Sequence, residues 1–376
     1  MKKRYLEKAV IEDLKTKMVF LGGPRQVGKT TFSLAIIKTE QLNHPAYLNW
    51  DEPGVSKKLI QGILPLDQKI VIFDEIHKYA KWRNLVKGLY DTRKDKTNFI
   101  VTGSARLDYY RKGGDSLLGR YHYYRLHPLS LAEISDKYSS LDLERLLRFG
   151  GFPEPYFKGN ETFHRRWQKE RVTRVIREDL RDLEQVKMIS DIEILAETLS
   201  TKVGSPLSIK SLREDLLKDH KTIENWVSIL ENLYYCFRIA PYGAPKIRAL
   251  KKEQKLYLWD WSEVENEGAR FENLVASQLL KYCHLLEDTE GYKMELRYIR
   301  DTDKREVDFV VLKNKKPLFA VECKKSDTSL SPALKYFKDR TDIPEFYQVH
   351  LGDKSYSKDG ISVLPFTDFC KKLKMP

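Results

Sequence analysis

The residues with the clearest chemistry lie in one short segment. Gly23 and Gly28 enclose four residues and are followed by Lys29 and Thr30, which is the spacing G-x-x-x-x-G-K-[ST]. Glycines let a backbone wrap closely around phosphates, the lysine reaches the β- and γ-phosphates, and the hydroxyl ligates Mg²⁺. The spacing predicts a binding loop for ATP and Mg²⁺, with Lys29 also in the catalytic set. The expected nucleotide-binding residues are Gly23, Pro24, Arg25, Gln26, Val27, Gly28, Lys29, Thr30 and Thr31.

The elements around this loop suit the same function. An apolar run, Met18–Leu21, precedes it, and a helical pattern, Phe32–Lys38, follows it. The amino end of a helix attracts phosphate through its free N–H groups and its dipole. A chance glycine turn before a lysine would lack this strand–loop–helix context.

Two carboxylates end a second apolar run. Ile70–Phe73 has the composition of a buried strand and is followed by Asp74 and Glu75. Asp74 is expected to hold Mg²⁺ through water, and Glu75 to polarise the attacking water as a general base. Taken alone, the pair could also be an acidic cap on a strand. The phosphate loop upstream favours the Walker B interpretation.

Two further strands extend the prediction. Phe99–Ser104 ends in polar residues, so Thr102 or Ser104 is a candidate sensor of the γ-phosphate. Ala46–Trp50 lies between the two motifs in the sequence. A strand inserted there, together with Glu75, indicates the additional-strand class of P-loop ATPases, which includes AAA+ proteins.

Arg120 is a candidate arginine finger. It lies just before a strand-like run, Tyr121–Leu126. An arginine in that place can approach a γ-phosphate in its own or a neighbouring subunit and stabilise transition-state charge. A surface arginine in a salt bridge fits the sequence equally well.

A third group of chemically active residues lies near the carboxyl end. Glu322 and Lys324 are two apart on one predicted strand, so they share a face, and Asp308 lies on the preceding hairpin strand. Such charges beside apolar neighbours are costly unless they bind something. A divalent cation held by Asp308 and Glu322, with Lys324 orienting or deprotonating water, is the arrangement for metal-dependent phosphodiester hydrolysis. The alternative is a structural ion pair.

Length and charge limit the classes of protein. The 376 residues predict two or three domains, and 41% hydrophobic with 32% charged residues is an ordinary soluble mixture. No apolar run approaches the roughly 18 residues of a membrane span, and no secretory signal is recognised. The net charge of +13 favours nucleic acid as partner, DNA more than RNA, although lysine-rich proteomes share this excess. Four scattered cysteines fit a cytoplasmic location.

The middle of the chain predicts a winged helix. Gly150–Pro155 is a turn cluster and a candidate hinge. Residues 191–250 contain three helical patterns, the third at His220–Leu230, and strands at Cys236–Ile239 and Lys255–Trp259 would form the wing. Winged helices read DNA with the third helix but also bind proteins, so the fold leaves both open.

With these motifs in order, nearly the whole chain resembles a prokaryotic family of AAA+ ATPases related to the STAND group. Its members join a P-loop domain to a winged helix and a C-terminal domain of unassigned function. The residues that carry the resemblance are 22–30, 73–77, 102–104, 128–133, 150–154, 306–309 and 322–324.

The C-terminal part is similar to the PD-(D/E)XK nuclease superfamily. Asp308, Glu322 and Lys324 match its catalytic set and Glu272 its helix carboxylate, although Val307 replaces the usual proline. The resemblance implies an α/β fold with an AAA+ P-loop domain (1–150), a helical and winged-helix domain (151–262) and a restriction-endonuclease-like domain (263–376). It implies ATP, Mg²⁺, and Mg²⁺ or Mn²⁺ at the C-terminal site. The metal ligands would be Thr30, Asp74, Glu272, Asp308 and Glu322.

Three functions remain open from the sequence. The chain could use ATP-driven movement to place a metal-dependent nuclease on nucleic acid. It could instead be a STAND-like switch whose C-terminal domain binds a partner without cutting. Third, it could be a homo-oligomeric motor with an arginine finger supplied in trans.

Overall fold

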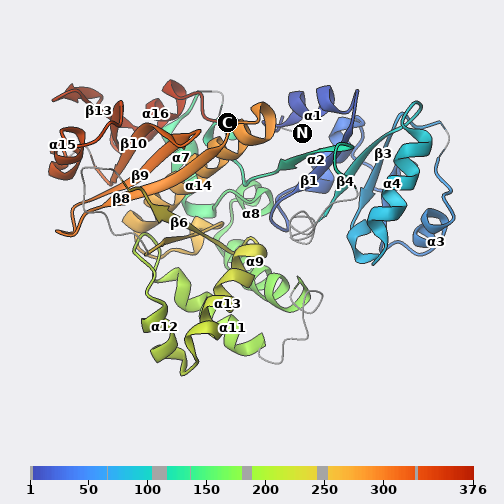
Figure 1. Cartoon of the computed structure of the whole chain (residues 1–376), viewed down its shortest axis with the longest axis horizontal. Coiled ribbons are helices and arrows are strands. Elements are labelled where there is room, and N and C mark those ends of the chain that lie inside the picture. The colour runs from blue at the N-terminus through green and yellow to red at the C-terminus, as the bar shows by residue number, and fades with distance from the viewer. Residues whose placement is uncertain are drawn as a thin grey trace. The chain divides into compact units, whose positions relative to one another are not determined.

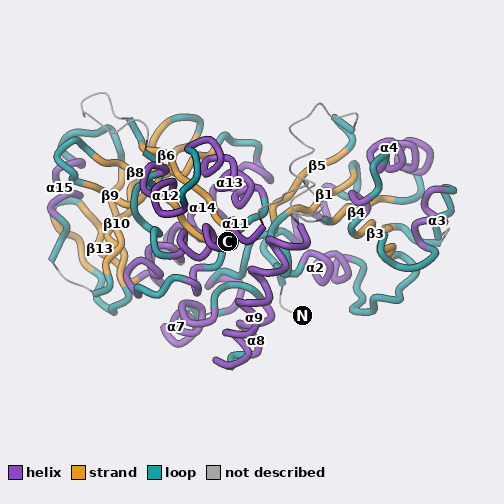
Figure 2. Tube along the Cα trace, turned by 90° about the horizontal axis from the view of Figure 1, so that it is seen from below, coloured by secondary structure: helices purple, strands orange, loops and turns teal. Residues whose placement is uncertain are grey.

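The computed structural model describes residues 3–65, 67–103, 117–135, 137–179, 189–243, 253–326 and 329–376. The chain divides into two compact units, Met1–Pro128 and Leu129–Pro376. Each unit contains its own sheet, seen as separate groups of strands in Figure 2. The predicted domain boundaries at 150/151 and 262/263 stay predictions.

The first unit alternates strands and helices, as Figure 1 shows in blue and cyan. Its helix after the phosphate loop begins at Lys29, three residues before the predicted start. Its elements are α1 (Glu7–Asp13), β1 (Met18–Gly22), α2 (Lys29–Ile36), β2 (Tyr47–Asn49), α3 (Val55–Ile60), β3 (Ile70–Asp74), η1 (Ile76–Lys78), α4 (Trp82–Arg93), β4 (Asn98–Thr102) and β5 (Tyr121–Arg125).

The sheet of this unit is parallel, with the order β2-β3-β4-β1-β5. The additional strand between the two Walker strands is therefore β4. Our prediction assigned that role to the strand at Ala46–Trp50, which was wrong, because β2 lies at the edge of the sheet. The strand that comes between the motifs in sequence is not the one that comes between them in space.

Apolar side chains on one sheet face hold α4 against the strands. Phe20, Phe73 and Phe99 come from three neighbouring strands and pack in one buried cluster with Trp82 and Leu89 of the helix. Parallel strands end at the same edge of a sheet, so this packing brings the carboxyl ends of β1, β3 and β4 together.

The second unit begins with helices and a hairpin, and a large sheet follows. Three helices, α11, α12 and α13, precede the antiparallel pair β6 and β7. The helical elements are α6 (Leu131–Ile134), α7 (Ser140–Phe149), α8 (Pro153–Lys158), α9 (Glu161–Arg174), the π-helical turn η2 (Val175–Asp179), α11 (Ile189–Ser200), α12 (Ile209–Leu216), α13 (His220–Asn232), η3 (Trp261–Glu263), α14 (Glu267–Glu290), α15 (Pro332–Lys338) and α16 (Phe366–Lys372).

The sheet of this unit has the order β12-β13-β11-β10-β9-β8-β6-β7. The hairpin predicted as a wing therefore joins the same sheet as the C-terminal strands, through a short pairing of β6 with β8. A sequence gives no direct sign of this pairing between distant segments. The strands are β6 (Cys236–Pro241), β7 (Lys255–Leu258), β8 (Met294–Arg300), β9 (Glu306–Lys313), β10 (Lys316–Lys324), β11 (Glu345–His350), β12 (Tyr356–Lys358) and β13 (Ile361–Pro365).

Candidate functional site

The phosphate loop connects β1 to α2 and depends on two glycines. Gly23 has φ +135°, and a Cβ there would lie 2.3 Å from the Leu126 carbonyl oxygen. Gly28, at the amino end of α2, has φ +94°. Both positions require glycine because side chains are strained at positive φ. The loop can therefore follow a path that residues with a Cβ could not.

The side chain of Lys29 folds back onto the phosphate loop. Its ammonium donates to the carbonyl oxygens of Gly23 (2.9 Å) and Pro24 (2.8 Å), and the residue is buried. These acceptors are neutral, so phosphate oxygens, which bind an ammonium more strongly, can replace them.

Asp74, at the end of β3, accepts hydrogen bonds from three hydroxyl groups. Thr30 (2.8 Å) and Tyr47 (2.7 Å) donate to Oδ2, and Thr102 donates to Oδ1. The donors come from α2, β2 and β4, so the order of the strands decides which side chains meet. Thr30 and Asp74 are thus placed together, as expected for the two sides of a Mg²⁺ site, and carboxylate and hydroxyl oxygens suit that ion.

Glu75 occupies the turn after β3 in a left-handed conformation with φ +56°. Such strained positions occur preferentially at functional sites. Burial and the neighbouring Asp74 raise the pKa of Glu75 to about 7, against the opposing effect of Lys29, Lys78 and Arg25. A carboxyl group with a pKa near 7 is well matched to accept a proton from water.

Arg120 lies at the amino end of the parallel strands, whereas the phosphate loop lies at their carboxyl end. Its carbonyl oxygen accepts from the Met18 N–H at the start of β1, and its guanidinium pairs with Asp91 (2.8 Å). The loop follows the other end of β1, roughly 15 Å away at the rise of a strand. Of the two alternatives for Arg120, action at the phosphate loop of its own subunit does not fit this position. A role in a neighbouring subunit stays a prediction, and Ser104 lies outside the described residues.

The second group of residues lies in the second unit. Asp308 of β9 accepts from the Cys323 N–H of β10 (2.9 Å), which lies between Glu322 and Lys324. Lys324 donates to Glu322 Oε1 (2.7 Å). The structure thus places these three predicted residues on adjoining strands. Glu322 is 6% exposed, and its Oε2 has no hydrogen-bond partner among the described residues.

A lysine that the sequence analysis missed lies among the carboxylates. Lys255 of β7 is completely buried. Its ammonium contacts Glu306 (2.6 Å), Glu272 (3.1 Å) and Asp308 (3.2 Å). Tyr257, on the same face of β7, donates to Glu272 (2.8 Å). Glu272 is therefore joined to Asp308 through Lys255.

Burial dominates the electrostatics of this cluster. Burial and the charge of Asp308 raise the pKa of Glu272 to about 7 and that of Glu322 to about 8, while Lys255 and Lys324 act in the opposite direction. For Lys255, burial disfavours the charged form, but the charges around it raise its pKa well above the usual value. Across the parts of the chain that the structure describes, no three His, Cys, Asp or Glu side chains are arranged to hold a metal ion.

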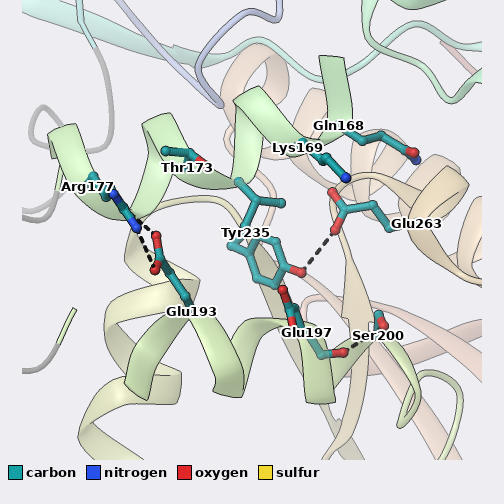
Figure 3. A pocket seen from close by; sticks show the side chains of 10 residues that line it. Gln168, Lys169, Thr173, Arg177, Glu193, Glu197, Ser200, Tyr235 and Glu263 are labelled. Atoms are coloured by element: carbon teal, nitrogen blue, oxygen red, sulfur yellow. Dashed lines mark hydrogen bonds and ion pairs between the residues drawn. The ribbon is translucent and has the colours of Figure 1, made fainter. Parts of the chain in front are cut away.

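The second unit also contains a polar cavity of about 490 Å³ that includes none of the predicted site residues. Figure 3 shows that Arg177 and Glu193 pair on one side of it, from η2 and α11, and that Tyr235 donates to Glu263 on the other. Arg171 pairs with the same Glu263 at 2.7 Å, so the charges here are largely matched within the protein.

Tyr47 and Lys255 are the main residues that sequence reasoning missed. Tyr47 lies on an edge strand whose pairing with β3 is not visible in the sequence. Lys255 had a weak signal, since it opens the otherwise apolar strand Lys255–Trp259.

Comparison with protein families agrees with the first site. The family model of an AAA domain matches residues 15–135. Two models of domains of unknown function match residues 140–263 and 267–369. Together with the loop and the sheet order, the match supports an AAA+-type P-loop ATPase domain at residues 15–135 and confirms the predicted α/β fold of this part.

Similar proteins give no further function. An uncharacterized protein of Methanocaldococcus jannaschii is 23% identical over 96% of this chain and 88% of its own length, and a second is 25% identical over 80% and 74%. An uncharacterized protein of Mycobacterium tuberculosis is 22% identical over 65% of this chain and 54% of its own length.

Solved structures show only distant likeness. The ORC1 protein of Aeropyrum pernix, in complex with DNA, has a TM-score of 0.35 at 11% identity, covering 74% of this chain and 94% of its own. The RuvB Holliday junction branch migration motor of Thermotoga maritima has a TM-score of 0.31 at 17% identity, covering 62% and 87%. Scores this low carry no functional argument. In the described residues, no helix has the length and apolar character needed to cross a membrane.

Proposed function

We propose that this chain hydrolyses ATP in a Mg²⁺-dependent reaction at the phosphate loop of its first unit. The observation that carries the proposal is the joining of Thr30 and Asp74 in one hydrogen bond, beside Lys29 and the raised pKa of Glu75. Phosphoryl transfer needs positioning and charge stabilisation more than covalent chemistry by the protein. These residues supply both.

Each side chain has a defined part in this reaction. Lys29 leaves the two loop carbonyls and binds the β- and γ-phosphates. Thr30 and Asp74 are the residues that would hold Mg²⁺, which neutralises phosphate charge when bound. Tyr47 and Thr102 keep the Asp74 carboxylate in place. Glu75 accepts a proton from the attacking water.

ATP hydrolysis by the full chain tests this proposal. Lys29→Ala removes the phosphate-binding ammonium and should abolish turnover, whereas Lys57→Ala, an exposed lysine on α3, should leave it unchanged. Turnover in Lys29→Ala equal to that of the wild-type protein would contradict the proposal.

We propose further that the nucleotide state changes how the second unit engages nucleic acid. The three helices α11–α13 with the β6–β7 hairpin have the order of a winged helix, and the chain carries a net charge of +13. Affinity for duplex DNA should fall steeply as salt rises, because phosphate contacts release counterions. Salt-independent binding, or equal affinity with ATP and ADP, would contradict this part and favour a switch that binds a protein.

A homo-oligomer with Arg120 acting in trans belongs to the same proposal. ATP turnover per chain should then rise with protein concentration and be lost in Arg120→Ala. An Arg120→Ala variant with full activity at high concentration would restrict Arg120 to its pair with Asp91.

Metal-dependent cleavage of nucleic acid by the second unit is a second candidate function. The unpartnered Glu322 Oε2 beside Lys324 favours it. The test compares wild-type protein with Lys324→Ala, and with Lys325→Ala as the matched control, on single-stranded and duplex DNA and on RNA with Mg²⁺ or Mn²⁺. Cleavage that only Lys324→Ala loses supports this function, and uncut substrates exclude it.

A further inference from the structure

The ammonium of Lys255 lies between carboxylates that the sequence predicted to bind a metal ion. Two of the three carboxylates that it contacts, Glu272 and Asp308, are predicted metal ligands. Its three partners come from α14 and from two positions on β9, so the lysine is held from more than one element. No part of the side chain reaches solvent.

Both carboxylate oxygens of Asp308 already accept a hydrogen bond, one of them from an ammonium. Oδ1 accepts from Lys255, and Oδ2 accepts from the Cys323 N–H. The oxygen without a partner, Glu322 Oε2, is a single ligand. Mg²⁺ keeps several waters in its near-octahedral shell and is held by one or two carboxylates, and here one of the two, Asp308, is already bound to the Lys255 ammonium.

Charge balance points the same way. Arg300 pairs with Glu306 (3.0 Å) and Lys324 with Glu322 (2.7 Å), so with Lys255 three protein cations already offset three of the four carboxylate charges. A divalent cation at Asp308 would have to displace the ammonium of Lys255. Removing one partner from a buried ion pair is strongly destabilising, because the remaining charge stays buried.

We propose that Lys255 takes the place of the divalent cation in this nuclease-like unit, so that its carboxylates form a cluster paired with protein cations rather than a metal centre. The consequence is a unit that binds its partner without metal-dependent cleavage. Lys324, whose side chain is 39% exposed, remains as the cation nearest to solvent. This proposal does not depend on ATP hydrolysis in the first unit.

Titration of the nucleotide-free full chain with Mn²⁺, followed by electron paramagnetic resonance, tests the proposal. The wild-type protein and Asp308→Asn should bind the same amount of Mn²⁺, because no ion is bound at Asp308. Lys255→Met, whose unbranched side chain is one atom shorter and uncharged, should gain one Mn²⁺ per chain. The double variant Lys255→Met/Asp308→Asn should lose it again.

The outcomes separate cleanly. Wild-type binding that Asp308→Asn abolishes overturns the proposal, as does a folded Lys255→Met that gains no Mn²⁺. If the wild-type protein binds Mn²⁺ and Asp308→Asn binds it equally well, the ion lies elsewhere, for example at Asp74. That result agrees with the proposal. If Lys255→Met does not fold, the comparison of wild-type protein with Asp308→Asn still decides the question.

Discussion

The phosphate loop and the Lys255 cluster use the same groups in opposite arrangements. In the first unit, Asp74 collects three neutral hydroxyl donors, and Lys29 rests on two neutral carbonyls. In the second unit, Lys255 is surrounded by three carboxylates. Neutral partners can be exchanged for a charged ligand at small cost, whereas a buried ion pair cannot. The first site is therefore ready for ATP and Mg²⁺, and the second is closed to a metal ion.

The largest expected effect concerns Glu75. Glu75→Gln keeps the shape of the side chain but cannot accept a proton, so turnover should fall by about 10²–10⁴-fold. Nucleotide binding, followed with a fluorescent ATP analogue, should persist. Unchanged turnover would show that Glu75 is not the general base, and the first site would then lack the catalytic role assigned to it.

The same residue predicts a pH dependence. The base must be ionised, and its pKa is raised to about 7. The kcat/KM for ATP should therefore rise with pH, about tenfold per unit below pH 7, and level off above it. The residual activity of Glu75→Gln should lack this step. A wild-type profile that stays flat from roughly one and a half pH units below this pKa to about one unit above it would contradict the assignment.

Tyr47→Phe should give a smaller effect. It removes one of the hydroxyls that position Asp74, and a hydrogen bond to a charged group contributes about 1.5–3 kcal/mol. A water molecule can replace the lost hydroxyl and restore much of this free energy. We therefore expect the Mg²⁺ concentration at half-maximal turnover to rise about five- to tenfold. Tyr90→Phe, whose hydroxyl donates to the Thr16 carbonyl oxygen, is the matched control. Equal behaviour of the two variants would mean that Tyr47 only packs.

The smallest effect is on stability. The pKa of Glu322 is raised in the folded protein to about 8, from an ordinary value of 4.5. A raised pKa means that its contribution to stability is fully present below pH 4.5 and is lost as pH rises through 8. Glu322→Gln does not titrate, so it should melt roughly 2–4 °C above wild-type protein at pH 8.

The control for this variant is Glu290→Gln, at the exposed end of α14. At pH 5 the melting temperatures of Glu322→Gln and wild-type protein should converge. Parallel curves at both values of pH would show that the Glu322 carboxyl is better solvated than its burial indicates. In that case the closed character of the second site would be in doubt.

The sequence predicted one of the two sites better than the other. The phosphate loop and the Walker B carboxylates are local patterns, so spacing alone was enough to find them. The place of β2 at the sheet edge, the contact of Tyr47 with Asp74 and the location of Arg120 depend on strand order, which spacing does not reveal. The C-terminal residues were placed on the right strands.

The contacts of Lys255 could not be predicted, because its partners are 17 to 53 residues away. It belongs to a strand that we interpreted as a wing, and that strand joins the C-terminal sheet through its hairpin partner. A pattern that matches a catalytic set therefore says which side chains are present. It does not say which distant side chain completes or closes the site.

The most direct test of the comparison is the number of Mn²⁺ ions bound per chain in the presence of a non-hydrolysable ATP analogue. We expect a single ion, which Thr30→Ala removes and Asp308→Asn leaves in place. A second ion that depends on Asp308 would contradict the contrast between an open first site and a closed second site.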